Sequence, residues 1–128
     1  KEISTAILDH KNNLKKIVKI VHSEVRKKML LFLKKNSKAK IVILDIPLLL
    51  ENKINKKEDI LVYVQSRKSS ILKNLKKRKN FNKKLLAIFK STQLPLSYKK
   101  KKSHFIIKNN FTKKSINDGI KSILKEII

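Results

Sequence analysis

The amino-acid sequence predicts an α/β fold with a parallel sheet, because short strands of the fully buried type alternate with helical segments. Residues 41–44, 60–64 and 105–107 form short, continuous apolar runs rich in β-branched residues. Apolar residues at helical spacing separate these runs. One glycine and two prolines in 128 residues favour long helices with short connections.

The first 36 residues are expected to be helical only. Apolar residues recur at helical spacing from Leu14 to Val21. Ser23 predicts the N-cap of a second helix, with Glu24 in its first turn opposing the helix dipole. That helix is expected to end at Asn36. The two helices either precede the sheet or form a helical insert in it.

The two runs near the middle of the chain are the first two predicted strands. The strand at 41–44 is expected to be buried on both faces and to stop at Asp45. The strand at 60–64 follows a polar stretch. Ser66 then predicts the N-cap of a helix that ends near Arg78.

The last third of the chain predicts two helices and a strand. A helix is expected over 83–91, and Pro95 prevents its continuation. The lysine block 99–102 is expected to be solvated. A third strand follows at 105–107, and Thr112 predicts the N-cap of a final helix.

The net charge of +25, from 34 basic and 9 acidic residues, raises nucleic-acid binding as a candidate function. However, the successive quarters of the chain hold 8, 7, 10 and 9 basic residues, so no basic arm stands out. Lysine accounts for 31 of the 34, whereas arginine is the residue suited to bidentate recognition. Lys, Ile and Asn have A/T-rich codons and supply 60 residues, which indicates a compositional background. A small basic nucleic-acid-binding module is therefore the alternative interpretation.

Several function classes are excluded or disfavoured by composition. The chain has no cysteine, which excludes disulfides, thiolate metal sites and cysteine nucleophiles. Its apolar runs are far shorter than the roughly 20 residues that a membrane span needs. We therefore expect a cytoplasmic protein with no membrane partner.

Ligands of parallel α/β sheets bind beyond the carboxyl ends of the strands. Three segments follow predicted strands here, at 45–51, 65–67 and 108–110. An acid in such a place, Asp45, can hold Mg²⁺ through water or accept a hydroxyl proton, as phosphoryl transfer requires. The alternative is that Asp45 only caps the next turn.

The segment from Asp45 to Glu51 resembles the D-x-P-L-L-x-E signature of dephospho-coenzyme A kinases. Upstream, His22 to Arg26 resembles the H-P-x-V-R motif of that family. Downstream, Arg78 matches the last basic position of the family's lid helix, and Gln93 matches a glutamine after the lid. Ile107 to Asn109 matches a strand-end I-x-N motif. The motifs keep the family's order over nearly the whole chain.

The resemblance implies a P-loop kinase-like core with a helical substrate-side region and a lid, of which this chain is the C-terminal portion only. It implies a helical coenzyme A-side region at 1–36, a nucleotide-kinase core at 37–66 and 103–128, and a lid with following helices at 67–102. The implied reaction moves the γ-phosphoryl group of ATP, with Mg²⁺, to the ribose 3′-hydroxyl of dephospho-coenzyme A. This is the last step of coenzyme A biosynthesis. Catalysis would come from positioning and charge neutralisation.

The resemblance also implies a set of site residues. Those for substrate binding are His22, Arg26, Asp45, Pro47, Leu48 and Glu51, and those for nucleotide binding are Arg78 and Asn109, with no metal ligand assigned. Arg78 is one of only three arginines, which favours a need for fork geometry. Alternatives remain: His22 can satisfy a backbone carbonyl, Arg26 and Glu51 can be solvated, and Asn109 can serve turn chemistry.

The largest departure from the family concerns the phosphate loop. The G-x-x-x-x-G-K-[ST] loop needs glycines so that backbone N–H groups can close on phosphates, and the single glycine here is Gly119. The resemblance predicts that this loop and the catalytic residues lie upstream of Lys1. We therefore expect little activity from these 128 residues alone.

Smaller departures concern single positions. Ser23 replaces a proline, and both are tolerated at a helix start. Asn74 and Leu96 stand where arginines are usual, and Ser103-His104 stands where Ala-Asp is usual. A degenerate relative kept as an interaction protein and a kinase acting on a nucleoside monophosphate remain alternatives.

Overall fold

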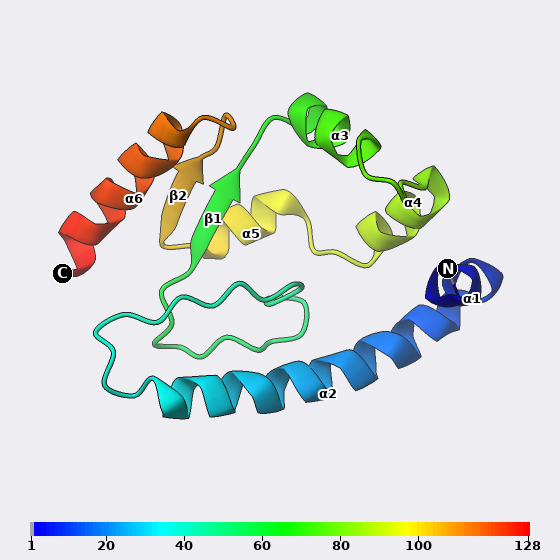
Figure 1. The fold of residues 1–128 in the computed structure, drawn as a ribbon, viewed down its shortest axis with the longest axis horizontal. Coiled ribbons are helices and arrows are strands. Elements are labelled where there is room, and N and C mark those ends of the chain that lie inside the picture. The colour runs from blue at the N-terminus through cyan, green and yellow to red at the C-terminus, as the bar shows by residue number, and fades with distance from the viewer. Residues whose placement is uncertain (1) are drawn as a thin grey trace. The chain divides into compact units, whose positions relative to one another are not determined.

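The computed structural model describes residues 2–128, which form six helices and a two-stranded sheet (Figure 1). In chain order the elements are α1 (Glu2–Asp9), α2 (Lys11–Lys35), β1 (Val62–Gln65), α3 (Lys68–Lys76), α4 (Lys83–Ser91), α5 (Leu96–Lys102), β2 (Phe105–Lys108) and α6 (Lys113–Ile127). They fall into two compact units. The first unit runs up to residue 55 and includes 83–93, and the second comprises 56–82 and 94–128.

The first unit is built on α2, a single helix from Lys11 to Lys35. The predicted break at Ser23 is therefore wrong. Serine costs only about half a kcal/mol relative to alanine inside a helix, and no glycine or proline stands nearby to stop the helix. The predicted end is confirmed, because the Asn36 N–H donates to the Phe32 and Leu33 carbonyls.

Helices α1 and α4 pack on each other in the first unit, and α1 also packs on the start of α2. Ile7 of α1 and Leu14 of α2 are buried there. The Asn13 side-chain amide donates to the Ala6 carbonyl at 2.9 Å, which fixes the turn between the two helices. Helix α4 has the predicted bounds, 83–91.

The run 41–44 is irregular and is not a strand, so this prediction is wrong. Ile43 is 85% exposed and Ile41 is 40% exposed, unlike residues of a strand buried on both faces. A strand is stabilised by ladder hydrogen bonds to neighbours, and the two strands of the described chain pair with each other. Asp45 therefore lies in an irregular segment and not at the end of a strand.

The second unit contains the parallel sheet that the sequence predicts, with β1 beside β2 (Figure 1). Val62 pairs with Phe105, and Gln65 pairs with Lys108. The parallel α/β class is thereby confirmed for the described residues. Strand β1 begins two residues later than predicted, because Leu61 is instead bonded to His104.

His104 closes the start of the sheet. Its N–H donates to the Leu61 carbonyl at 2.8 Å, and its Nδ1 accepts from the Leu61 N–H at 2.9 Å. Both backbone groups of Leu61 are thus bonded to one residue 43 positions away. His104, the residue before β2, to which no function was assigned from the sequence, is therefore linked to Leu61, the residue before β1.

The helices of the second unit differ from prediction mainly at their starts. Arg67 and not Ser66 is the N-cap of α3, without a side-chain cap bond, and α3 ends at Lys76. The lysine block 99–102 is part of α5, although Lys100 to Lys102 are exposed as expected. The cap at Thr112 is confirmed, since its hydroxyl accepts from the Ser115 N–H at 3.2 Å.

Among residues 2–128, no helix combines the length and the apolar character that crossing a membrane requires.

Gly119 lies where α6 packs against β2. A Cβ at this position would lie 3.0 Å from Cγ2 and 3.2 Å from Cγ1 of Ile107, the buried residue of β2. Such contacts are tighter than ordinary van der Waals packing. The single glycine of the chain thus allows close approach of helix and sheet.

We predict that the effect of Gly119→Ala on stability depends on Ile107. With Ile107→Ala in place, Gly119→Ala should stabilise by about 1 kcal/mol through helix propensity. With Ile107 present, the contact should offset that gain, giving a coupling free energy of about 1–3 kcal/mol. Urea unfolding followed by circular dichroism measures all four variants. Asn117→Ala, at an exposed position of α6, should be additive with Ile107→Ala, and equal effects of Gly119→Ala in both backgrounds would contradict the account.

Candidate functional site

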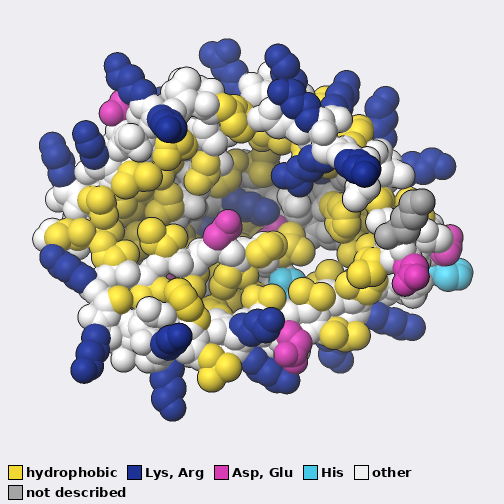
Figure 2. Space-filling model, viewed as in Figure 1, with side chains coloured by type: hydrophobic (Ala, Val, Ile, Leu, Met, Phe, Trp, Pro, Cys, Tyr) yellow, Lys and Arg dark blue, Asp and Glu magenta, His cyan; other side chains and the backbone are white. Residues whose placement is uncertain are grey.

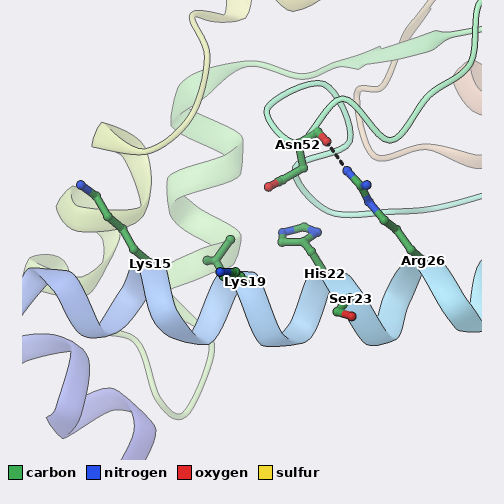
Figure 3. Close-up of a pocket in the computed structure, with 7 residues that line it drawn as sticks. Lys15, Lys19, His22, Ser23, Arg26 and Asn52 are labelled. Atoms are coloured by element: carbon green, nitrogen blue, oxygen red, sulfur yellow. Dashed lines mark hydrogen bonds between the residues drawn. The ribbon is translucent and has the colours of Figure 1, made fainter.

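A hollow of about 540 Å³ lies in the first unit, between one face of α2 and the segment that follows it (Figure 3). Its lining residues are Lys15, Val18, Lys19, His22, Ser23, Arg26 and Asn52. The six helical residues recur at steps of three and four, the spacing of one helix face. Two of the predicted substrate residues, His22 and Arg26, therefore lie together here.

Arg26 connects helix α2 to the segment that carries the D-x-P-L-L-x-E motif, Asp45 to Glu51. Its Nη2 donates to the backbone carbonyl of Asn52 at 2.8 Å (Figure 3). Asn52 directly follows Glu51, the last residue of the D-x-P-L-L-x-E segment. A charged donor makes this bond stronger than a neutral one. The two motifs, separated in sequence, are thus physically connected.

Asn52 also organises the turn that contains the motif. Its backbone N–H and its Nδ2 both donate to the Leu48 carbonyl, at 3.1 and 2.9 Å. Leu48 has a φ of 55°, a left-handed conformation that costs a non-glycine residue about 1–2 kcal/mol. The Ile54 N–H donates to the Leu49 carbonyl, and the Ile54 side chain is buried. Asn52 is not among the residues predicted from the sequence, although an asparagine beside a motif is a recognised turn signal.

His22 is half-buried, and its Nδ1 atom is buried without a hydrogen-bond partner among the described residues. The alternative that this nitrogen satisfies a backbone carbonyl therefore does not hold for this structure. A buried polar atom without a partner costs about 1–3 kcal/mol, so such atoms are rare in folded proteins. In Figure 3 the ring lies between Lys19 and Arg26 along the helix.

Asp45 lies at a second hollow, of about 270 Å³, and not at the first. The lining residues of the second hollow are Val25, Lys28, Met29, Phe32, Ile43, Leu44, Asp45 and Ile46. Asp45 and Pro47 are exposed, whereas Leu48 and Glu51 are half-buried. The structure therefore places all six predicted substrate residues in one unit, but at different points along it.

The two predicted nucleotide residues lie in the second unit. Arg78 is exposed beyond the end of α3, where its N–H donates to the Leu75 carbonyl. Asn109 follows β2, and its Oδ1 accepts from the Phe111 N–H at 2.7 Å. This is the turn chemistry named above as the alternative for Asn109, and Phe111 has a φ of 67°. Nucleotide binding by both residues stays a prediction.

Carboxylates and imidazoles do not gather into a metal centre in the part of the chain that the structure describes. No group of three or more His, Asp or Glu side chains is placed to hold an ion there.

Comparison with known proteins gives one consistent family. The family model described as dephospho-CoA kinase matches residues 1–115. The dephospho-CoA kinase of Wolbachia pipientis wMel is 31% identical over 127 residues, which cover 98% of this chain and 65% of that protein. That of Leptospira interrogans serovar Lai is 30% identical over 129 residues, which cover 100% of this chain and 62% of that protein. The chain thus spans less than two thirds of the length of these relatives.

We predict that Asn52→Ala loosens the turn at 47–53. The substitution removes the side-chain bond to the Leu48 carbonyl while keeping the backbone carbonyl that Arg26 uses. The free energy of unfolding should fall by about 1 kcal/mol. Hydrogen exchange of the Ile54 amide, which is bonded within this turn, should accelerate.

The matched control is Asn12→Ala, at an exposed position of α2. It removes the same side chain and should leave stability equal or slightly higher, because alanine is the better helix former. An Asn52→Ala variant as stable as the Asn12→Ala variant would show that the turn does not depend on Asn52.

Proposed function

The chain belongs to the dephospho-CoA kinase family, and on this premise we propose that the protein containing it phosphorylates dephospho-CoA with ATP. The acceptor is the ribose 3′-hydroxyl, and the product is coenzyme A. The observation that carries the assignment is the family match over residues 1–115. The Arg26–Asn52 hydrogen bond, which joins the segments of the two family motifs, is the structural feature that agrees with it.

We infer a division of work between the two units. The first unit holds His22, Arg26 and the segment from Asp45 to Glu51, and it takes the acceptor. The second holds the parallel sheet, Arg78 and Asn109, and it takes the nucleotide. The resemblance further implies a coenzyme A-side region at 1–36, a P-loop kinase-like core at 37–66 and 103–128, and a lid region at 67–102. These bounds differ from those of the units, because the first unit also includes 37–55 and 83–93.

The proposed chemistry is positioning combined with charge neutralisation. His22 and Arg26 orient the acceptor, and the turn with Pro47 and Leu48 shapes its pocket. Arg78 offers a planar fork of N–H donors that matches phosphate oxygens. The divalent ion that accompanies ATP supplies further neutralisation of phosphate charge.

We also propose where the reaction takes place and whether these residues suffice for it. The reaction consumes ATP and dephospho-CoA, and we place it in the cytoplasm. One glycine in 128 residues cannot build a glycine-rich phosphate loop, so we expect these residues alone to turn over ATP slowly. The protein that contains the chain is therefore the proper subject of an activity assay.

We predict that Arg78→Lys lowers kcat in that protein by at least about tenfold, because lysine keeps the charge but loses the fork. Mass spectrometry of coenzyme A formed from dephospho-CoA and ATP measures the rate. Lys79→Ala removes a charge at the adjacent position and should change kcat by less than about twofold.

Two outcomes would count against these assignments. Failure of the protein to form coenzyme A would contradict the proposed function. Coenzyme A formation at an unchanged rate in Arg78→Lys would keep the function and remove Arg78 from the site.

A further inference from the structure

Lys15 and Lys19 extend the row of His22 and Arg26 by two turns toward the start of α2 (Figure 3). The four residues stand at successive steps of four, three and four, so they share one face of the helix. Neither lysine belongs to a motif on which the family resemblance rests. Their place in the hollow is therefore information that the structure adds.

The lining of this hollow carries positive charge without an acidic residue. Lys15, Lys19 and Arg26 are its charged members, and Asp and Glu are absent from the seven lining residues. Like charges one turn apart on a helix destabilise it by roughly 0.2–0.5 kcal/mol per pair. An anion bound in the hollow would remove that repulsion.

The acidic residue of α2 in this region, Glu24, forms an ion pair with Lys27 and not with Lys15 or Lys19. Glu24 accepts from Lys27 Nζ at 2.8 Å, and both side chains are more than half exposed. This pair does not line the hollow. The positive charge on the face of Lys15 and Lys19 is therefore separate from the ion pair of the same helix.

Hydrogen-bond donors are also available in the hollow. Arg26 uses Nη2 for the Asn52 carbonyl, which fixes the guanidinium while leaving its other N–H groups. Each lysine ammonium carries three donors. The Nδ1 of His22 is buried without a partner in the described residues, so it does not face the open part of the hollow, and the donors come from Arg26 and the two lysines. The hollow thus offers donors and positive charge together.

Size and spacing indicate what kind of anion fits. The hollow is open to solvent, and its volume of about 540 Å³ leaves room for more than a single phosphate. Lys15 and Lys19 start about 6 Å apart along the helix, and their long, flexible side chains can reach two adjacent phosphate groups only by turning toward each other. A diphosphate linked to larger groups on both sides matches this arrangement.

We propose that this hollow binds the diphosphate of the acceptor substrate, and that Lys15 and Lys19 are substrate-positioning residues. The identity of the acceptor rests on the proposed function, since dephospho-CoA carries a diphosphate between its pantetheine and adenosine parts. Free pyrophosphate shares this chemistry and is the second possible source of the anion.

Isothermal titration of the 128-residue chain tests the site with three probes: dephospho-CoA, inorganic pyrophosphate and pantetheine, which lacks a diphosphate. The variant Lys15→Ala/Lys19→Ala should bind dephospho-CoA and pyrophosphate at least about tenfold more weakly. The matched control Lys16→Ala/Lys34→Ala removes the same charge from exposed positions of α2 outside the hollow. It should change either affinity by less than about twofold. Pantetheine should not displace pyrophosphate.

An independent readout separates positioning from general charge. Pyrophosphate should shift the imidazole NMR signals of His22 in the wild-type chain and in the control, but not in Lys15→Ala/Lys19→Ala. Equal weakening by both double variants would overturn the proposal, because net charge alone would then explain binding. Circular dichroism should show the same helix content in both variants.

The outcomes also distinguish this site from the proposed function. Binding of dephospho-CoA with unchanged affinity in Lys15→Ala/Lys19→Ala would overturn the site and keep the function. Lysine-dependent binding of pyrophosphate without binding of dephospho-CoA would keep an anion site and contradict the function. If neither dephospho-CoA nor pyrophosphate binds, the site is overturned.

Discussion

The hydrogen bond from Arg26 to the Asn52 carbonyl is the contact on which the proposed acceptor site of the first unit depends. It connects a long, regular helix to a segment that has no helix or strand of its own. That segment is held by local bonds to Leu48 and by the buried side chain of Ile54. A single charged donor thereby fixes an irregular turn against a rigid scaffold, as binding sites on loops require. The same guanidinium borders the hollow, so the bond also sets the shape of the proposed acceptor site.

The helices and strands could be predicted where the residues that stabilise them, including a pairing strand for each strand, lie within these 128 residues. Helix α4 and the Thr112 cap were predicted correctly from local sequence patterns. The strands β1 and β2 were predicted from two apolar runs, and these two runs pair with each other in the structure. The strand at 41–44 failed because a buried strand needs neighbours, and in the described chain the two strands pair with each other. The predicted N-cap at Ser23 was wrong, because the preference of serine for a cap position is too weak to interrupt a long helix. Figure 2 shows many hydrophobic side chains on the visible surface, which agrees with the exposure of Ile43.

The candidate site was predictable as motifs but not as geometry. The resemblance singled out His22 and Arg26, and the structure places them on one hollow. It did not indicate Asn52, which lies just outside the motif, and the carbonyl that Arg26 uses is a backbone group that every residue has. Nor could it select Lys15 and Lys19 from 31 lysines, because only the helix face distinguishes them from their neighbours. In Figure 2 the Lys and Arg side chains are scattered over the visible face, so charge alone does not mark a site.

We infer that Arg26 holds the segment 45–51 in place for the acceptor. The sharpest test is the affinity for dephospho-CoA of the 128-residue chain that carries Arg26→Lys. Lysine keeps the charge but lacks the planar fork that bonds the Asn52 carbonyl while leaving N–H groups for a ligand. The affinity of Arg26→Lys should be at least about tenfold lower than that of the wild type. Arg67→Lys, at the exposed start of α3, should leave the affinity unchanged. Equal affinity of the wild type and Arg26→Lys would contradict the claim.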